Sequence, residues 1–312
     1  MLSTVTSLIE SILFMFLILG AASLSGYFSE KVGIVNLSID GQMIFGALTF
    51  SVFAMIFFPL GNGTFVIPMI LSMLFSVVSS GLFGFLTIKL KSDHVISGVA
   101  INLLFAGLAT FLSPILGPII SNGNSNKLKS DYVPIFQIGD TNIFGSTLIM
   151  FIIIGLIFIA LWFFIHKTAF GLRFRAVGEN PNAIDAQGIN VDRIKWIGIL
   201  ISGVLASLAG SIFMLRSPIT FNGEVNGLGF LAIAILIAGS WKMPLVILSS
   251  FVFAIIFEIF DSNSLINIDG LNYIRELLRT IPYVLSLLFL VIFSKKSLFP
   301  AALGLPFDKT KR

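Results

Sequence analysis

The sequence of 312 residues contains no cysteine, only two histidines, and charged side chains at only 11% of its positions. Without cysteine, disulfides, thiol catalysis and cysteine-ligated metals are excluded. The two histidines, His94 and His166, are far apart in the chain, which argues against a histidine-rich metal site. A soluble domain usually carries charge on about a quarter of its residues. The scarcity of charge therefore points away from a soluble protein.

Apolar residues make up 56% of the chain, and its mean hydropathy is +1.03. Soluble packing cannot bury this much apolar surface, so we expect lipid to be the solvent. Two shorter apolar pieces, 33–40 and 227–239, adjoin longer apolar stretches. The sequence predicts an all-α polytopic membrane protein with about eight to ten transmembrane or half-membrane helices. The expected spans are 5–27, 41–60, 64–88, 95–114, 143–165, 196–215, 243–260 and 281–294.

Basic residues gather in a few loops, and this bias predicts the orientation in the membrane. Of the 19 Lys and Arg residues, 13 lie in four segments: 28–32, 89–94, 166–195 and 294–312. We expect 166–195 to be a cytoplasmic loop and 295–312 a cytoplasmic tail, and we expect the polar stretch 115–142 to be an outer loop. The N terminus then lies outside, although a re-entrant piece near 33–40 would reverse that.

The stretch GIVNLSIDGQMIFGAL, residues 33–48, places polar side chains among apolar runs. If it is helical, Asn36 and Asp40 share one face, and Ser38 and Gln42 share another. Ionisable residues at membrane depth are functional candidates, and irregular backbone there survives only against protein or water. Together with 227–239, which is expected to form half of a discontinuous helix, this stretch predicts a central translocation path. Asp40 could instead lie in the interface or cap a helix.

Two further polar features remain open to a functional and a structural interpretation. Asn102 lies on an expected membrane helix, where its amide could contact a solute or join neighbouring helices. In the loop 166–195, Asn180 and Pro181 are suited to start a short helix, and Gly188 is placed to end it. Such a helix could dock onto a partner protein, or the loop could be a solvated connector. These residues indicate a multi-span transporter or channel.

Four stretches resemble a known family: EKVGIVNLSIDGQMIFGA, ISGVAINLLFAGLATF, GLRFRAVGENPNAIDAQGINV and GFLAIAILIAGSWKMP. They look like the permease subunits of bacterial ABC importers for nucleosides, which are relatives of ribose and branched-chain amino-acid permeases. The family's first motif reads Asn-(Leu/Ile)-Gly-(Leu/Ile)-Glu-Gly; here Ser38 replaces the glycine and Asp40 the glutamate. In the last motif the family's Arg and Asn-Pro are replaced, although Lys242 keeps the charge. The resemblance implies a single permease domain over 1–312 with a type II-like ABC importer fold.

The resemblance also implies roles for individual residues. It implies that the pore lies between two permease subunits, where Phe45 and Phe105 could stack on a base. The residues expected to border the solute path are Asn36, Ser38, Asp40, Gln42, Phe45, Asn102 and Phe105. The residues expected to dock onto the ATPase are Gly178, Glu179, Asn180, Pro181, Asn182, Ala183, Asp185 and Gly188.

The chain has no GxxxxGK[ST] phosphate loop and no evident nucleophile–base arrangement, so we expect a non-enzymatic chain. ATP and Mg²⁺ are expected on a separate ATPase subunit, and no cofactor on this chain. Other expected partners are a second permease subunit (a related one or another copy), an extracytoplasmic solute-binding lipoprotein and membrane lipids, but not nucleic acid. The expected location is the bacterial cytoplasmic membrane. The alternatives are import of a sugar or a branched-chain amino acid by the same fold, and an ion-coupled transporter or channel.

Overall fold

The structure, a computed structural model, describes residues 2–58, 65–123, 125–128, 144–216, 220–261, 280–288, 291 and 299–307. Seven helices of this part are long and apolar enough to cross a membrane, which confirms the predicted all-α polytopic fold. They lie within α1 (Leu2–Glu30), α2 (Ile39–Phe57), α3 (Val66–Gly84) with its π-helical continuation Phe85–Lys89, α4 (His94–Ile120), α5 (Phe144–Lys167), α8 (Val191–Arg216) and α10 (Met243–Asp261). The shorter helices are α6 (Ala169–Glu179), α7 (Pro181–Ala186) and α9 (Leu228–Ala238).

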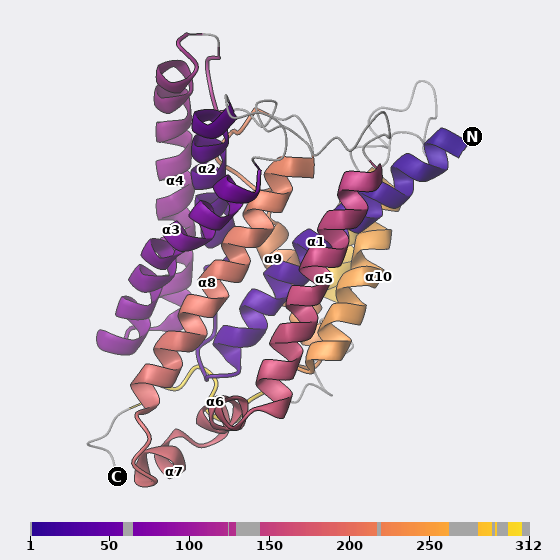
Figure 1. Cartoon of the computed structure of the whole chain (residues 1–312). Helices are drawn as coiled ribbons and strands as arrows, with labels where there is room; N and C mark the ends of the chain where they lie inside the picture. The colour runs from indigo at the N-terminus through magenta and orange to yellow at the C-terminus, as the bar shows by residue number, and fades with distance from the viewer. Residues whose placement is uncertain are drawn as a thin grey trace.

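Helix α8 runs through the middle of the bundle, with α2, α3 and α4 on one side and α1, α5 and α10 on the other (Figure 1). The short helices α6 and α7 lie together at one end, and the start of α1 lies at the opposite end (Figure 1). We call the first of these the α7 end and the second the far end. This arrangement separates the short loop helices from the N terminus by the full height of the bundle.

Small residues let α8 pack closely against its neighbours. A side chain at Gly210 would overlap the Met43 carbonyl of α2, so the two backbones touch there. Hydroxyl pairs join further helices: Ser25 and Ser202 link α1 to α8 with oxygens 2.9 Å apart. Because lipid gives helices no hydrophobic reason to associate, close packing and interhelical hydrogen bonds hold such a bundle together.

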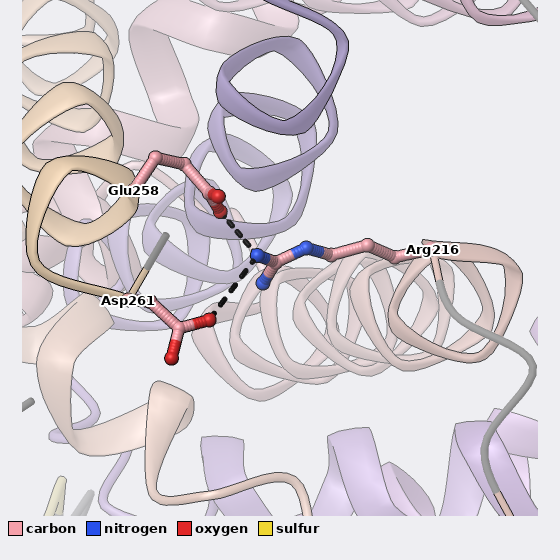
Figure 2. A network of polar contacts seen from close by, with 3 residues as sticks. All are labelled: Arg216, Glu258 and Asp261. Carbon is pink, nitrogen blue, oxygen red and sulfur yellow. Dashed lines mark ion pairs between the residues drawn. The ribbon is translucent and has the colours of Figure 1, made fainter. Parts of the chain in front are cut away.

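An ion-pair cluster joins α8 to α10 at the far end (Figure 2). The Arg216 guanidinium, at the last residue of α8, pairs with Glu258 and lies 3.6 Å from the carboxylate of Asp261. Both carboxylates come from the last turn of α10. The pairing balances charges that would otherwise be costly to bury among membrane helices.

Some expected boundaries need correction. The loop expected at 166–195 begins later and ends earlier, because α5 continues to Lys167 and α8 starts at Val191, and α6 and α7 fill most of it. Helix α4 continues to Ile120, so 115–120 is helix rather than outer loop, while 129–142 lies outside the described residues. In the span expected at 281–294, residues 280–288 are helical.

The orientation predicted from loop charge can be tested with single cysteines, because the chain has none of its own. Asn126 and Ala186 are both exposed, the second at the end of α7. We expect Asn126→Cys to react with a membrane-impermeant thiol reagent on intact cells, and Ala186→Cys to react only in inverted vesicles. The opposite pattern of labelling would reverse the orientation and remove α7 from the cytoplasmic side.

Candidate functional site

Helix α9 begins in the middle of the bundle rather than at either end. Its 11 residues span only about 16 Å at 1.5 Å per residue, roughly half of a hydrocarbon core. Shortly after its last turn, the Trp241 indole N–H donates to the Glu30 carboxylate at 2.5 Å. Glu30 is the last residue of α1 and lies at the α7 end, so α9 ends near that end of the bundle. The first residues of α9 therefore lie about halfway through the bundle, which confirms the predicted half-helix.

Helix α2 also starts at this depth, and an irregular segment leads to it. Residues 31–33 form a turn and 34–36 have no regular secondary structure, so Asn36 precedes the helix that begins at Ile39. The shared helical face considered for Asn36 and Asp40 is therefore not formed. The segment departs from helix because its polar groups are bound by neighbouring helices.

The starts of α2 and α9 are capped by side chains from other helices. The Gly229 N–H of α9 donates to the Asp40 carboxylate at 3.0 Å, and the Gly41 N–H of α2 donates to the Asn102 amide oxygen at 2.7 Å. The Asn102 amide nitrogen also donates to the Leu37 carbonyl at 2.8 Å. The first N–H groups of a helix have no partner within the helix, so caps are needed at this depth. We call Leu37–Gly41, Asn102 and Gly227–Gly229 the midpoint junction.

Glycines bring these backbones into contact at the midpoint junction. A side chain at Gly229 would overlap the backbone of Asp40, and one at Gly41 would come within 2.7 Å of the Asn102 Cα atom. Gly227 ahead of α9 has a φ of +71°, a left-handed conformation that glycine adopts without strain. The junction is thus built from close backbone contacts as well as caps.

A buried chain of polar side chains runs from the midpoint junction to α8. Gln42 donates to the Ser38 hydroxyl at 2.9 Å, Ser38 donates to the Asn36 oxygen at 2.6 Å, and Asn36 donates to Ser202 at 2.8 Å. The side chains of Asn36, Ser38 and Gln42 have no exposed surface. In this structure these three side chains hold the start of α2 to α8. Asp40, the fourth residue of this stretch that is expected to border the solute path, is partly exposed.

The two expected aromatic path residues lie against each other. The rings of Phe45 on α2 and Phe105 on α4 have centroids 4.7 Å apart and are tilted by 46°. They are 9% and 4% exposed, so their faces pack α2 against α4 in this structure. Their stacking on a solute stays a prediction.

The capped short helix predicted in the longest loop is confirmed. The Asn180 side chain accepts from the Ala183 N–H at 3.1 Å, Pro181 occupies the first turn, and α7 follows. Gly188 then has a φ of +79°. Gly178 and Glu179 end α6, and Asn180 is at once the C-cap of α6 and the N-cap of α7. The exposed side chains of Asn182 and Ala183 make α7 available to a partner.

The C-terminal segment 299–307 packs beside α7. The Ala302 N–H donates to the Gly178 carbonyl at 2.9 Å, and the Gly304 N–H donates to the Gly33 carbonyl at 3.0 Å. A hollow of about 310 Å³ lies between Glu179–Asn182 and Ala301–Phe307. Burial lowers the pKa of Lys31, and the attraction of Glu179 opposes this change. The segment therefore connects the α7 region to the turn that leads toward the midpoint junction.

Residues 8–293 match the family described as the branched-chain amino acid transport system / permease component. The chain belongs to this permease family. Three relatives are similar over most of their length. An uncharacterized Mycoplasma genitalium protein is 39% identical over 93% of this chain and 94% of its own. The nucleoside ABC transporter permease NupC of Lactococcus lactis and the guanosine ABC transporter permease NupQ of Bacillus subtilis are each 33% identical over 93% of this chain and 92% of their own.

No solved structure matches this permease significantly. Its two notable regions are the midpoint junction inside the bundle, and α7 with segment 299–307 at one end. The family resemblance found in the sequence is thus confirmed, while the roles of individual residues stay predictions.

Sequence reasoning missed several residues of the permease that lie at or near the midpoint junction. Glu224, Asn226 and Phe230 are exposed just before and within α9, and the Tyr283 hydroxyl donates to the Asn226 carbonyl at 2.7 Å. Glu30 was also missed, although it opens the first family motif. The Asn226-Gly227 pair is a turn signal that could have marked this site.

Proposed function

We propose that this chain is the membrane-spanning permease subunit of an ATP-driven importer for nucleosides in the bacterial cytoplasmic membrane. The observation that carries the proposal is its 33% identity to NupC and NupQ over nearly their full length. Both relatives are named for nucleoside or guanosine transport. The seven spanning helices and the capped α7 are the parts that such a subunit requires.

The energy for transport would come from a separate ATPase subunit that holds ATP and Mg²⁺. Because the chain has no phosphate loop, it would bind no nucleotide itself and catalyse no reaction. Docked α7 would pass the closure of the ATPase to the bundle as a rigid-body movement. Segment 299–307 supports this route, since its bonds to Gly178 and Gly33 join the α7 region to the segment before α2.

The solute would pass between this chain and a second permease subunit after delivery by a lipoprotein receptor on the outer face. Polar groups on the exposed side of the midpoint junction support a path there, because lipid is a poor neighbour for them. Switching between outward and inward access would follow from the two states of the ATPase.

An uptake panel on the assembled complex tests this function. Proteoliposomes that contain the permease, its ATPase, its second permease and the receptor should take up purine or pyrimidine nucleosides only with internal ATP and Mg²⁺. Sugars and branched-chain amino acids serve as the comparison solutes. Uptake of ribose or leucine with no nucleoside uptake would refute the proposed solute class, and ion-driven uptake without the ATPase would refute the importer mechanism.

A further inference from the structure

A mixed polar and aromatic surface lies on the exposed side of the midpoint junction. Phe230 is 48% exposed one residue after Gly229, and Glu224 and Asn226 are exposed on the segment that enters α9. The Tyr283 hydroxyl is fixed to the Asn226 carbonyl by a hydrogen bond of 2.7 Å. We call Glu224, Asn226, Phe230 and Tyr283 the junction face.

The junction face lies within the thickness of the bundle. Gly223 abuts the backbone of Thr110 on α4, while Asn102, about two turns nearer the α7 end of that helix, caps α2. Glu224 follows Gly223, and the Leu228 N–H donates to the Val225 carbonyl in the turn that starts α9. Gly223, the neighbour of Glu224, therefore lies at the level of Thr110, ten residues before the end of α4.

An exposed carboxylate at this depth cannot face lipid without a large cost. Other exposed positions of the bundle differ from it, since α5 presents Ile159 and Phe163 and α3 presents Leu74 and Val78. Those surfaces suit hydrocarbon. The junction face suits water or a polar solute, because an acid, an amide and two aromatic rings are combined there.

We propose that Glu224 is a solute-contacting residue of the transport path and that it makes this part of the path reject anions. A carboxylate only accepts hydrogen bonds, so Glu224 fits the hydroxyl pair of a sugar or the N–H groups of a base. Phe230, which is 48% exposed, could stack on a flat heterocycle. This inference rests on the proposed function for the identity of the solute, but its electrostatic part holds for any solute.

Asp40 has a different role from Glu224. Its carboxylate is engaged by the Gly229 N–H and so occupies the positive end of α9, where an anionic solute group would otherwise be attracted. Glu224, exposed five residues before Gly229, adds a second carboxylate on the segment that enters α9. A neutral nucleoside passes such a surface, whereas a nucleoside phosphate is repelled.

Single cysteines in the complete transporter test this directly. Phe230→Cys should react with water-soluble thiosulfonate reagents, and the cationic reagent should react faster than an anionic one of equal size. Adding Glu224→Gln should lower the ratio of cationic to anionic rates about tenfold, and Glu224→Asp should keep the ratio. Phe163→Cys, at a 57% exposed position on α5, is the lipid-facing control and should stay unreactive.

The inference is overturned if Phe230→Cys is as unreactive as Phe163→Cys, or if Glu224→Gln leaves the rate ratio unchanged. Protection of Phe230→Cys by a nucleoside would place the solute on the junction face. Reactivity with the expected ratio, but no nucleoside uptake by the wild-type complex, would remove the proposed solute and leave the anion-rejecting path standing. The two failures are therefore distinguishable.

Discussion

Replacing Asp40 with leucine should abolish uptake and lower the yield of folded permease several-fold. The substitution removes the acceptor of the Gly229 N–H and leaves the start of α9 without its cap. An unsatisfied buried N–H costs about 1–3 kcal/mol in proteins, and water is scarce at this depth. The backbones of Gly229 and Asp40 are in close contact, so a side chain would not fit at Gly229. Helix α9 therefore cannot shift toward another acceptor without losing this contact with α2.

Asp40→Asn is the matched control for this prediction. Asparagine keeps the size of the side chain and an oxygen that can accept from Gly229, so yield and uptake should stay close to wild type. Yield is measured by size-exclusion chromatography of the tagged complex, and uptake in proteoliposomes. Loss of uptake in both variants at normal yield would mean that the negative charge itself acts on the solute. Normal yield and uptake in Asp40→Leu would show that the cap is unimportant.

The combined substitution of Asn180→Ala, Pro181→Ala and Gly188→Val should uncouple the ATPase from the permease, so that solute no longer stimulates ATP hydrolysis and uptake is lost. It removes the cap bond to Ala183 and forces a branched side chain into a left-handed turn. Loss of the N-cap alone costs about 1 kcal/mol, so the six-residue α7 should fray. Uptake should fall at least about tenfold, while the complex still assembles and the receptor still binds solute.

The control for this triple variant lies in the same loop. Asn190 accepts from the Arg193 N–H at 3.1 Å and caps α8, so Asn190→Ala removes a cap without touching α7. We expect solute-stimulated ATP hydrolysis to be lost in the triple variant and kept in Asn190→Ala. If the triple variant keeps stimulated hydrolysis and uptake, α7 is a connector and the docking role is wrong.

The features that sequence reasoning predicted are those set by local chemistry. Long apolar runs predict spans from hydropathy alone, and the 13-residue apolar piece 227–239 is too short to span, which predicts the half-helix that the structure shows as α9. The helix α7 was predicted because Asn180, Pro181 and Gly188 each fix the backbone within a few residues. The family resemblance rested on the same local stretches.

The features that were missed depend on contacts between distant parts of the chain. The Asp40–Gly229 bond joins residues 189 positions apart, and the Trp241–Glu30 bond joins residues 211 apart. Asn102 was correctly considered as a link between helices, but its partners Leu37 and Gly41 could not be named from sequence. The irregular backbone of residues 34–36 could not be located for the same reason, since the rules for helical patterns do not describe caps supplied by other helices.

The external caps of α2 and α9 also determine the order in which this protein can mature in the membrane. A helix that supplies its own caps can insert by itself, and long apolar helices do so before they associate. Helix α9 is too short to insert as a span, and its Gly229 N–H has the Asp40 carboxylate as its acceptor only when α2 is already in place. The midpoint junction must therefore close after the long helices have entered the bilayer. A newly made chain that stalls before this step keeps backbone N–H groups without acceptors at mid-depth, which is costly in lipid.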